Sequence, residues 1–354
     1  MSRFFSGKYA RLTPYTPGEQ PQDRQYIKLN TNESPFPPSP MAQRLARLEA
    51  GELQLYSDPA CKKLVSAAAE AFGVRPDEIM FTNGSDDILN FAVMAFCDAD
   101  HPAVFPDVTY GLYSVLCAVN GVPYEEIPLA EDFTLRVSDY CGVGKTVFLA
   151  NPNAPTGIPL PRREIEKILS SNPDSVVVVD EAYVDFGGES CLGLIGTYKN
   201  LLVTRTFSKS RSLAGGRLGF GVGDRELIRD LNTLRYSTNP YNINRMTMMA
   251  GVGALADEKY FRACTEEIIR VRQETAAEME KLGFEMTPSA ANFLFARHPQ
   301  FGGAELYALL RDRGILVRHF ETPRLKDYNR ISVGSREDMR ALLNALRELT
   351  GERA

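Results

Sequence analysis

A lysine stands among hydroxyl side chains at the end of an apolar run, in the segment LLVTRTFSKSRSLAGGRLGFG (201–221). Lys209 follows Thr206 and Ser208, and Arg217 comes after a run of small residues. A lysine in this place can be a solvated surface charge, a phosphate contact or a nucleophile that forms an imine. The residues that follow the other apolar runs decide between these roles.

Polar side chains also follow the other apolar runs of the first 245 residues. Ser85 and Asp86 come after EIMFT at the expected start of a helix, where free backbone N–H groups and the helix dipole attract an anion. The remaining candidates are Tyr110 after AVF, Asn153 after TVFLA, and Asp180 and Tyr183 at and after VVVVD. Because ligands of open α/β sheets collect beyond the carboxyl ends of the strands, we expect these residues to share one rim.

Each candidate alone has an ordinary explanation. Asp180 could cap a helix, Tyr110 could be a core aromatic and Lys209 could be a surface charge. Together they provide an anion cradle, an aromatic plate, a carboxylate, a phenol and a lysine. That set suits pyridoxal phosphate, which needs a lysine for its imine, an acid partner for its ring nitrogen and cations for its phosphate.

The sequence segments that carry these residues indicate an α/β fold. Apolar runs bounded by Gly, Pro and Asn alternate with helical patterns, which is typical of buried, mostly parallel strands in a central sheet flanked by helices. We expect three parts: an extended, proline-rich N-terminal arm (1–30), a large α/β domain that binds the cofactor (31–245) and a smaller α+β C-terminal domain (246–354). Helices are expected to end at Gly73 and Gly283 and to begin near Ser335, with Asp338 completing the cap.

Composition excludes several classes of function. The net charge of −5 provides no general basic field for nucleic acid or an anionic membrane. Six dispersed cysteines and three histidines form no metal-ligand spacing, so no metal site is expected and the thiols suit a cytoplasmic protein. GVGKT (142–146) resembles the end of a P-loop, but Asp139 stands where that motif needs its first glycine.

Several motifs resemble those of a known family. NPNAPTG, DEAY and SKSRSLAGGRLGF are similar to the pyridoxal-phosphate-dependent aminotransferases of fold type I, in class II of that family. LTPYTPGEQP, KLNTNESPFPPSP, YSDP, PDVTYG and NRISVGSRED resemble, within it, the histidinol-phosphate aminotransferases. The motifs occur in the family's order and span nearly the whole chain.

The resemblance implies a role for each candidate. Lys209 would be the Schiff-base lysine and proton shuttle, and Asp180 would keep the pyridine nitrogen protonated. Tyr183 would contact the ring hydroxyl and Tyr110 would stack on the ring. The implied phosphate ligands are Arg217, Thr206, Ser208, the backbone at Ser85–Asp86, and Tyr56 of YSDP reaching the neighbouring subunit's cofactor in a homodimer.

The resemblance also implies the substrates. Arg330 would bind a carboxylate. Together with Arg318 and Tyr15 beside it, Arg330 would also bind a phosphate monoester, whose oxygens suit the planar donor groups of arginine. The expected reaction moves an amino group between glutamate and imidazole-acetol phosphate, giving histidinol phosphate and 2-oxoglutarate. The alternatives are a threonine-phosphate decarboxylase or an aromatic amino-acid aminotransferase of the same fold. A cofactor-sensing regulator would need a DNA-binding appendage, and the segment before residue 40 is too short and proline-rich for a helix-turn-helix.

The chain departs from the family pattern at one position. An asparagine directly before PTG usually bonds the ring hydroxyl, and here that position is Ala154. Asn153 is the neighbouring candidate for the role, although adjacent side chains normally point in different directions. If Asn153 does not reach, Tyr183 alone must hold the ring hydroxyl.

Overall fold

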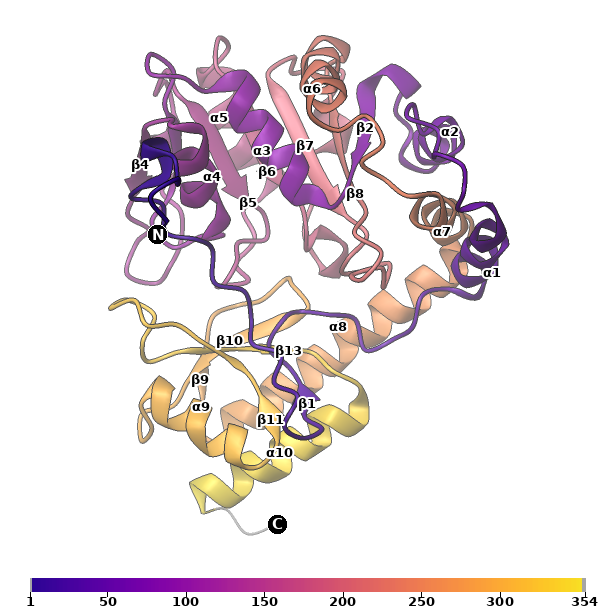
Figure 1. Cartoon of the computed structure of the whole chain (residues 1–354). Helices are drawn as coiled ribbons and strands as arrows, with labels where there is room; N and C mark the ends of the chain where they lie inside the picture. The colour runs from indigo at the N-terminus through magenta and orange to yellow at the C-terminus, as the bar shows by residue number, and fades with distance from the viewer. Residues whose placement is uncertain (1, 352–354) are drawn as a thin grey trace.

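A seven-stranded sheet forms the centre of the larger part of the computed structural model, which describes residues 2–351 (Figure 1). The strands, in spatial order, are β2 (Ile79–Thr82), β8 (Gly219–Gly223), β7 (Leu201–Thr206), β6 (Val177–Asp180), β5 (Thr146–Ala150), β3 (Ala103–Pro106) and β4 (Tyr124–Ile127). Strand β8 runs antiparallel to both of its neighbours, and every other pair in this sheet is parallel. The expected mostly parallel sheet is confirmed.

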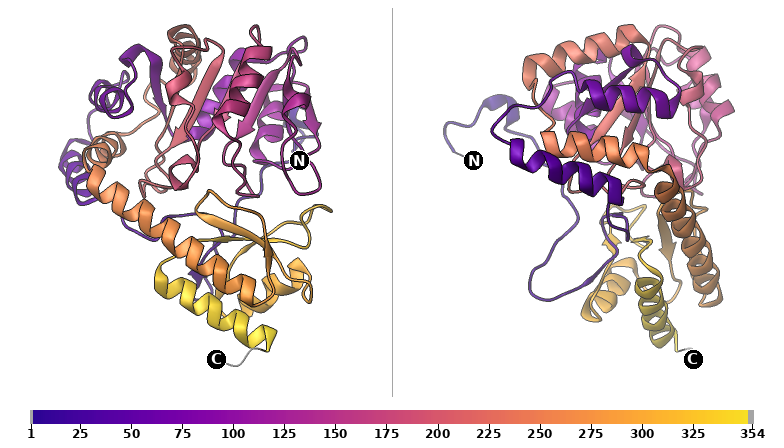
Figure 2. Two further views of the ribbon diagram at one scale, coloured as in Figure 1. Left: turned by 180° about the vertical axis from the view of Figure 1, so that it is seen from behind. Right: turned by 90° about the vertical axis from the view of Figure 1, so that its right-hand side faces the viewer.

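Both faces of this sheet are covered by helices, as Figure 2 shows. The helices on one face are α2 (Lys62–Phe72), α5 (Arg162–Ser171) and α7 (Arg245–Ala256); those on the other are α3 (Ser85–Phe96), α4 (Leu112–Asn120) and α6 (Arg225–Thr238). This explains the continuous apolar runs, because alternate side chains of a strand enter two different cores. Val178 packs with α3 and α4, whereas Val177 and Val179 pack with α2 and α5.

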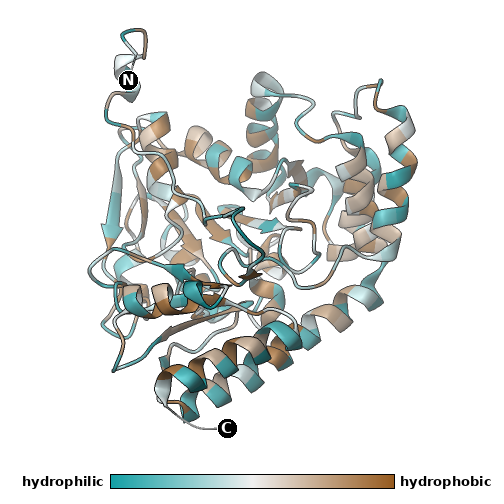
Figure 3. Ribbon diagram, turned by 60° about the horizontal axis from the view of Figure 1, so that its bottom comes forward, coloured by the Kyte–Doolittle hydropathy of each residue, from teal (hydrophilic) through white to brown (hydrophobic). Residues whose placement is uncertain are grey.

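The smaller part contains a four-stranded antiparallel sheet and three helices. Its strands, in spatial order, are β12 (Arg318–His319), β13 (Asn329–Ser332), β10 (Phe293–Arg297) and β9 (Glu285–Met286), and its helices are α8 (Glu258–Lys281), α9 (Gly303–Asp312) and α10 (Arg336–Thr350). Helix α8 descends from the large part and packs beside α10, and both carry alternating apolar and polar faces (Figure 3). An α+β C-terminal region is therefore present as expected.

The predicted helix boundaries are found in the structure. Helix α2 is followed by Gly73 with a φ of 66°, and α8 ends at Lys281, just before Leu282 and Gly283, which has a φ of 86°. These left-handed conformations are the ones that glycine adopts without steric cost. Helix α10 begins after Ser335, whose hydroxyl and the Asp338 carboxylate form a capping box.

The N-terminal segment projects from the body at its exposed first described residues and then crosses the smaller part (Figures 1 and 2). Its strand β1 (Ile27–Lys28) pairs in parallel with β11 (Ile315–Leu316) of the smaller part. It then continues into α1 (Pro40–Glu49), which lies against α7. The short 3-10 turns are η1 (Gly7–Tyr9), η2 (Ala50–Glu52), η3 (Pro76–Glu78), η4 (Val137–Tyr140), η5 (Val184–Phe186) and η6 (Leu192–Leu194).

Within residues 2–351, no helix combines the length and apolar character needed to cross a membrane.

Candidate active site

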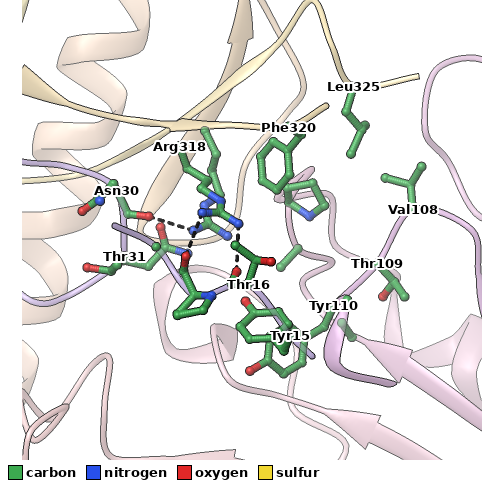
Figure 4. Close-up of a pocket in the computed structure, with 18 of the residues that line it drawn as sticks. Tyr15, Thr16, Asn30, Thr31, Val108, Thr109, Tyr110, Arg318, Phe320 and Leu325 are labelled. Atoms are coloured by element: carbon green, nitrogen blue, oxygen red, sulfur yellow. Dashed lines mark hydrogen bonds between the residues drawn. The ribbon is translucent and has the colours of Figure 1, made fainter. Parts of the chain in front are cut away.

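A cavity of about 1140 Å³ lies between the two parts, beyond the carboxyl ends of β5, β6 and β7 (Figure 4 shows part of its lining). It brings together twelve of the predicted site residues: Tyr15, Ser85, Asp86, Tyr110, Asp180, Tyr183, Thr206, Ser208, Lys209, Arg217, Arg318 and Arg330. They come from both parts of the fold and from the N-terminal segment. Their convergence follows from the sheet, because parallel strands deliver their following loops to one edge.

Lys209 lies just beyond β7, in the interior of this cavity. Its Nζ donates a hydrogen bond of 3.0 Å to the carbonyl oxygen of Thr31. Burial, together with the positive charge of Arg330, lowers the pKa of Lys209 to about 8. The lysine therefore has an accessible neutral form near neutral pH, which is the form that attacks a carbonyl.

Asp180, the last residue of β6, is 4% exposed. Its Oδ2 accepts a hydrogen bond of 3.1 Å from the Tyr113 hydroxyl, and its Oδ1 accepts one of 3.2 Å from the Ala182 N–H. Burial raises the pKa of Asp180 to about 7, against the opposing effect of the Tyr113 hydrogen bond. A carboxyl group in this state is suited to bind a protonated ring nitrogen, whose charge would stabilise the carboxylate.

Tyr113 was not predicted from the sequence. It lies in the first turn of α4, three residues after Tyr110, and its buried hydroxyl reaches Asp180 behind the cavity wall. Tyr110 donates a hydrogen bond of 3.0 Å to Asp86, and its ring contacts that of Tyr113 edge-on at 5.7 Å. The spacing of the two tyrosines was the available signal.

A cradle for an anion forms where α3 begins. Helix α3 starts at Ser85, and the guanidinium of Arg217 lies 3.0 Å from the Asp86 carboxylate at its first turn. The Ser208 hydroxyl is buried and has no hydrogen-bond partner among the described residues. Strand β8 approaches this turn so closely that a Cβ on Gly219 would lie 2.2 Å from the Ser85 nitrogen.

The smaller part contributes two arginines from neighbouring strands. Arg330 of β13 donates a hydrogen bond of 3.1 Å to the Asn30 carbonyl and lies over the ring of Phe293 at 5.3 Å. Arg318 of β12 pairs with it in register and donates hydrogen bonds to the carbonyls of Thr16 and Pro17, shown in Figure 4. Burial lowers the pKa of Arg330, yet guanidinium remains charged in proteins.

Tyr15 closes the cavity from the N-terminal segment. Its ring meets that of Tyr110 edge-on, with centroids 5.9 Å apart (Figure 4). The neighbouring residues Thr16 and Pro17 are held by Arg318. The segment thus links the two arginine-bearing strands to the aromatic wall of the large part.

Asn153 does not take the place expected for it. Its Nδ2 donates to the Val108 carbonyl and to the Thr156 hydroxyl, each at 3.0 Å, and its Oδ1 accepts from Thr109, also at 3.0 Å. These hydrogen bonds occupy the Asn153 amide with neighbouring loop residues. Ala154 lines the cavity, and Asn153 does not. This corrects the interpretation of Asn153 as a contact of the ring hydroxyl.

Tyr56 also lies outside the cavity lining. Its side chain is 79% exposed and stacks on Tyr241 with centroids 4.5 Å apart. Within one subunit it makes no contribution to the cavity.

These side chains fit pyridoxal phosphate. The orphaned Ser208 hydroxyl, the free N–H groups at the start of α3 and the Arg217 guanidinium suit its phosphate. Lys209 and Asp180 suit the aldehyde and the ring nitrogen. The donor set matches the cofactor at each of its polar ends.

Comparison with known proteins agrees with this geometry. The model of the family "Aminotransferase class I and II" matches residues 24–346. The chain is 48% identical to histidinol-phosphate aminotransferase 2 of Dechloromonas aromatica, over 99% of this chain and 100% of that protein. It is 46% identical to the histidinol-phosphate aminotransferase of Aromatoleum aromaticum, over 99% of each.

A solved structure supports the same assignment. The histidinol-phosphate aminotransferase of Sinorhizobium meliloti in complex with pyridoxal-5'-phosphate superimposes with a TM-score of 0.89 at 26% identity, covering 100% of this chain and 99% of that one. The resemblance predicted from the motifs and the predicted fold are confirmed, and the chain belongs to the pyridoxal-phosphate-dependent aminotransferases of classes I and II.

Proposed function

We propose that the chain transfers an amino group between glutamate and imidazole-acetol phosphate, giving histidinol phosphate and 2-oxoglutarate in histidine biosynthesis. The observation that carries the proposal is one cavity in which a buried lysine, a buried carboxyl group and two arginines from a second part of the fold converge. The names of the relatives in Dechloromonas aromatica and Aromatoleum aromaticum support the choice of substrate.

Each side chain would have a defined task. Lys209 would bind the cofactor aldehyde and would move the substrate α-proton, and Asp180 would hold the ring nitrogen; both line the cavity. The phosphate would lie against Ser208, Arg217 and the start of α3. When bound, pyridoxal phosphate supplies an electron sink for the charge left by proton removal.

The two arginines form one group of cations that would serve both substrates. Arg330 is fixed by burial and by the Asn30 carbonyl, which suits a carboxylate of glutamate. Arg318 and Tyr15 lie beside it at the cavity mouth, where the phosphate of the second substrate would bind. One set of cations then serves both halves of the exchange.

We further propose a homodimer in which Tyr56 of each subunit completes the phosphate cradle of the other. The tyrosine is exposed in the single chain and is flanked by the exposed side chains of Leu53 and Leu55. A cytoplasmic location fits the six cysteines, none of which is in a disulfide.

The test is the visible absorption of the purified, cofactor-loaded protein with histidinol phosphate added and no keto acid present. Loss of the band of the lysine-bound cofactor at low substrate concentration would support the proposal. Threonine phosphate and an aromatic amino acid are the matched comparisons, and a response to either in place of histidinol phosphate would reassign the substrate. The Lys209→Ala variant is the control and should give no such band.

A further inference from the structure

The hydroxyl group of Tyr183 accepts one hydrogen bond and donates none among the described residues. It accepts a hydrogen bond of 3.0 Å from Nδ2 of Asn32. Among the residues that the structure describes, none accepts the proton of this hydroxyl. Both Tyr183 and Asn32 line the cavity, so the phenolic proton remains available to a ligand.

The amide of Asn32 is oriented by a serine from the smaller part. The backbone N–H of Asn32 donates to Ser332 Oγ at 2.8 Å, and Ser332 Oγ lies 2.9 Å from Asn32 Oδ1. A serine hydroxyl has one proton and two lone pairs: Ser332 accepts from the backbone N–H, and among the described residues Oδ1 of Asn32 is the acceptor that its proton reaches. With Oδ1 engaged in this way, the amide must turn its NH₂ group toward Tyr183.

Three hydrogen bonds thus form one chain. Ser332 accepts from the Asn32 N–H and donates its proton to Oδ1 of Asn32, and the amide oriented by that proton donates to the Tyr183 oxygen. Since that oxygen already accepts, its proton is directed away from Asn32. The structure describes no acceptor for it, and it faces the cavity.

The relay is buried and rigid. Asn32 is 1% and Ser332 2% exposed, and Asn32 has a φ of 55°, in the left-handed region that asparagine tolerates better than most residues. Its carbonyl accepts a hydrogen bond of 3.0 Å from Asn292. The Ser332 N–H donates to the Leu29 carbonyl at 2.9 Å, which ties β13 to the N-terminal segment.

Lys209 Nζ lies 5.8 Å from the centroid of the Tyr183 ring, and the apolar neighbours of that ring have no side-chain donor. Ala154, Ala291 and Phe293 pack together beside it, with the Phe293 ring edge-on at 5.1 Å. A polar atom of a ligand placed against this wall would therefore meet the proton of Tyr183. This contact does not require the asparagine that the family usually has at the position of Ala154.

We propose that Ser332 and Asn32 are positioning residues that direct the hydroxyl proton of Tyr183 toward the ring oxygen of bound pyridoxal phosphate. This inference rests on the proposed function, because it requires that cofactor in this cavity. A hydrogen bond to the ring oxygen stabilises its anionic form. It therefore weakens the attraction for the proton on the adjacent lysine–cofactor linkage and lowers the pKa of that linkage.

The test is a pH titration of the visible absorption of the cofactor-loaded protein, which reports that pKa without any turnover. Ser332→Ala removes the proton that holds Asn32 Oδ1, so the amide can turn and its oxygen can take the Tyr183 proton. We expect the midpoint to rise by about 1 pH unit, a roughly tenfold gain in proton affinity. Ser332→Cys, which keeps the volume with a weaker donor, should shift it in the same direction by less.

A double variant separates positioning from loosening of the fold. In a Tyr183→Phe background there is no phenolic proton to direct, so adding Ser332→Ala should leave the midpoint where Tyr183→Phe alone places it. Ser39→Ala, which removes another buried serine hydroxyl at the start of α1, should leave the wild-type midpoint unchanged.

Two results would overturn the inference: an unchanged midpoint in both Ser332 variants, or a further rise when Ser332→Ala is added to Tyr183→Phe. A wild-type protein that shows no visible band with pyridoxal phosphate would instead contradict the proposed function. The two failures are therefore distinguishable in the same experiment.

Discussion

At the scale of single residues, two ionisable groups in the cavity have pKa values shifted away from those they have in water. Burial raises the pKa of Asp180 to about 7 and lowers that of Lys209 to about 8. Both shifts disfavour the charged form, so each group is prepared to gain a partner of opposite charge or to react as a neutral species. The protonated ring nitrogen of bound pyridoxal phosphate would be the partner of Asp180, and its aldehyde would react with the neutral form of Lys209.

Asp180 should make the stability of the cofactor-free protein depend on pH. Its folded-state pKa of about 7 lies above the ordinary aspartate pKa of 3.8, so the folded protein retains a proton that the unfolded chain releases. Stability from this group is present at low pH and is lost as pH rises from about 4 to 7, with a slope of up to ~1.4 kcal/mol per pH unit. Asp180→Asn should remove this dependence.

Urea unfolding of the cofactor-free wild type and Asp180→Asn at pH 5 and pH 7.5 measures the effect. The wild type should lose about 2–3 kcal/mol more stability than the variant between these pH values. Equal losses would mean that Asp180 is already ionised at pH 5.

Arg330 should bind both substrates. Arg330→Ala removes a guanidinium that burial has already desolvated, so the apparent affinities for histidinol phosphate and for 2-oxoglutarate should each fall by about 10- to 100-fold. Arg318→Ala is the comparison, and it should weaken the phosphate substrate more than the dicarboxylate. Steady-state KM values for the two substrates decide this, and an Arg330→Ala enzyme with both values unchanged would refute the assignment.

Residue types at strand ends predicted most of the cavity, but not its hydrogen-bond partners. Lys209 and Asp180 could be found because they stand at or just after the end of an apolar run, and Arg217 because it belongs to the family motif SKSRSLAGGRLGF. Tyr113 and Asn32 could not be assigned, since their roles depend on contacts with residues distant in sequence. Asn153 failed for the same reason, because its amide bonds depend on a loop more than forty residues away.

At the scale of elements, the cofactor cradle depends on close packing of β8 against the start of α3. Gly219 permits this approach, and Gly221 of the same strand lies against Ile88 of α3. The run GFGVG was not predicted as a strand, because glycines lack the side chains that give a strand its pattern. Helix ends were predicted well, since Gly73, Gly283 and Ser335 are local signals.

Gly219→Ala should displace the start of α3 and weaken the anion cradle. Its methyl group would lie 2.2 Å from the Ser85 nitrogen and 2.4 Å from the Gly84 carbonyl carbon, both of them backbone atoms. Overpacking of this kind costs about 1–3 kcal/mol, so we expect about 10-fold or greater loss of affinity for pyridoxal phosphate.

Gly215→Ala is the matched control, because nothing lies within 4 Å of its added methyl group. Cofactor affinity can be measured by fluorescence or absorption titration of both variants. Equal affinity in Gly219→Ala and Gly215→Ala would show that the close approach of β8 is not needed for the cradle.

At the scale of the whole molecule, the exposed side chain of Tyr56 predicts complementation between subunits. Mixed dimers of Tyr56→Phe and Lys209→Ala would contain one site with an intact lysine and an intact tyrosine from the other subunit. After reassortment, roughly a quarter of the sites should be intact. Activity above the sum of the separate variants would support the shared site, and purely additive activity would count against it.

The pairing of β1 with β11 has a consequence for biosynthesis. Ile27 pairs with Ile315, and Asn32 is hydrogen-bonded to Ser332. Residues that the ribosome makes early can therefore form these contacts only after residues near the C-terminus have been made. The strands that carry Asp180 and Lys209 can assemble while translation continues, because their pairings are all within residues 79–223. Contacts of such long sequence separation form slowly, and the nascent chain is expected to complete its cofactor pocket only after release of its C-terminal region.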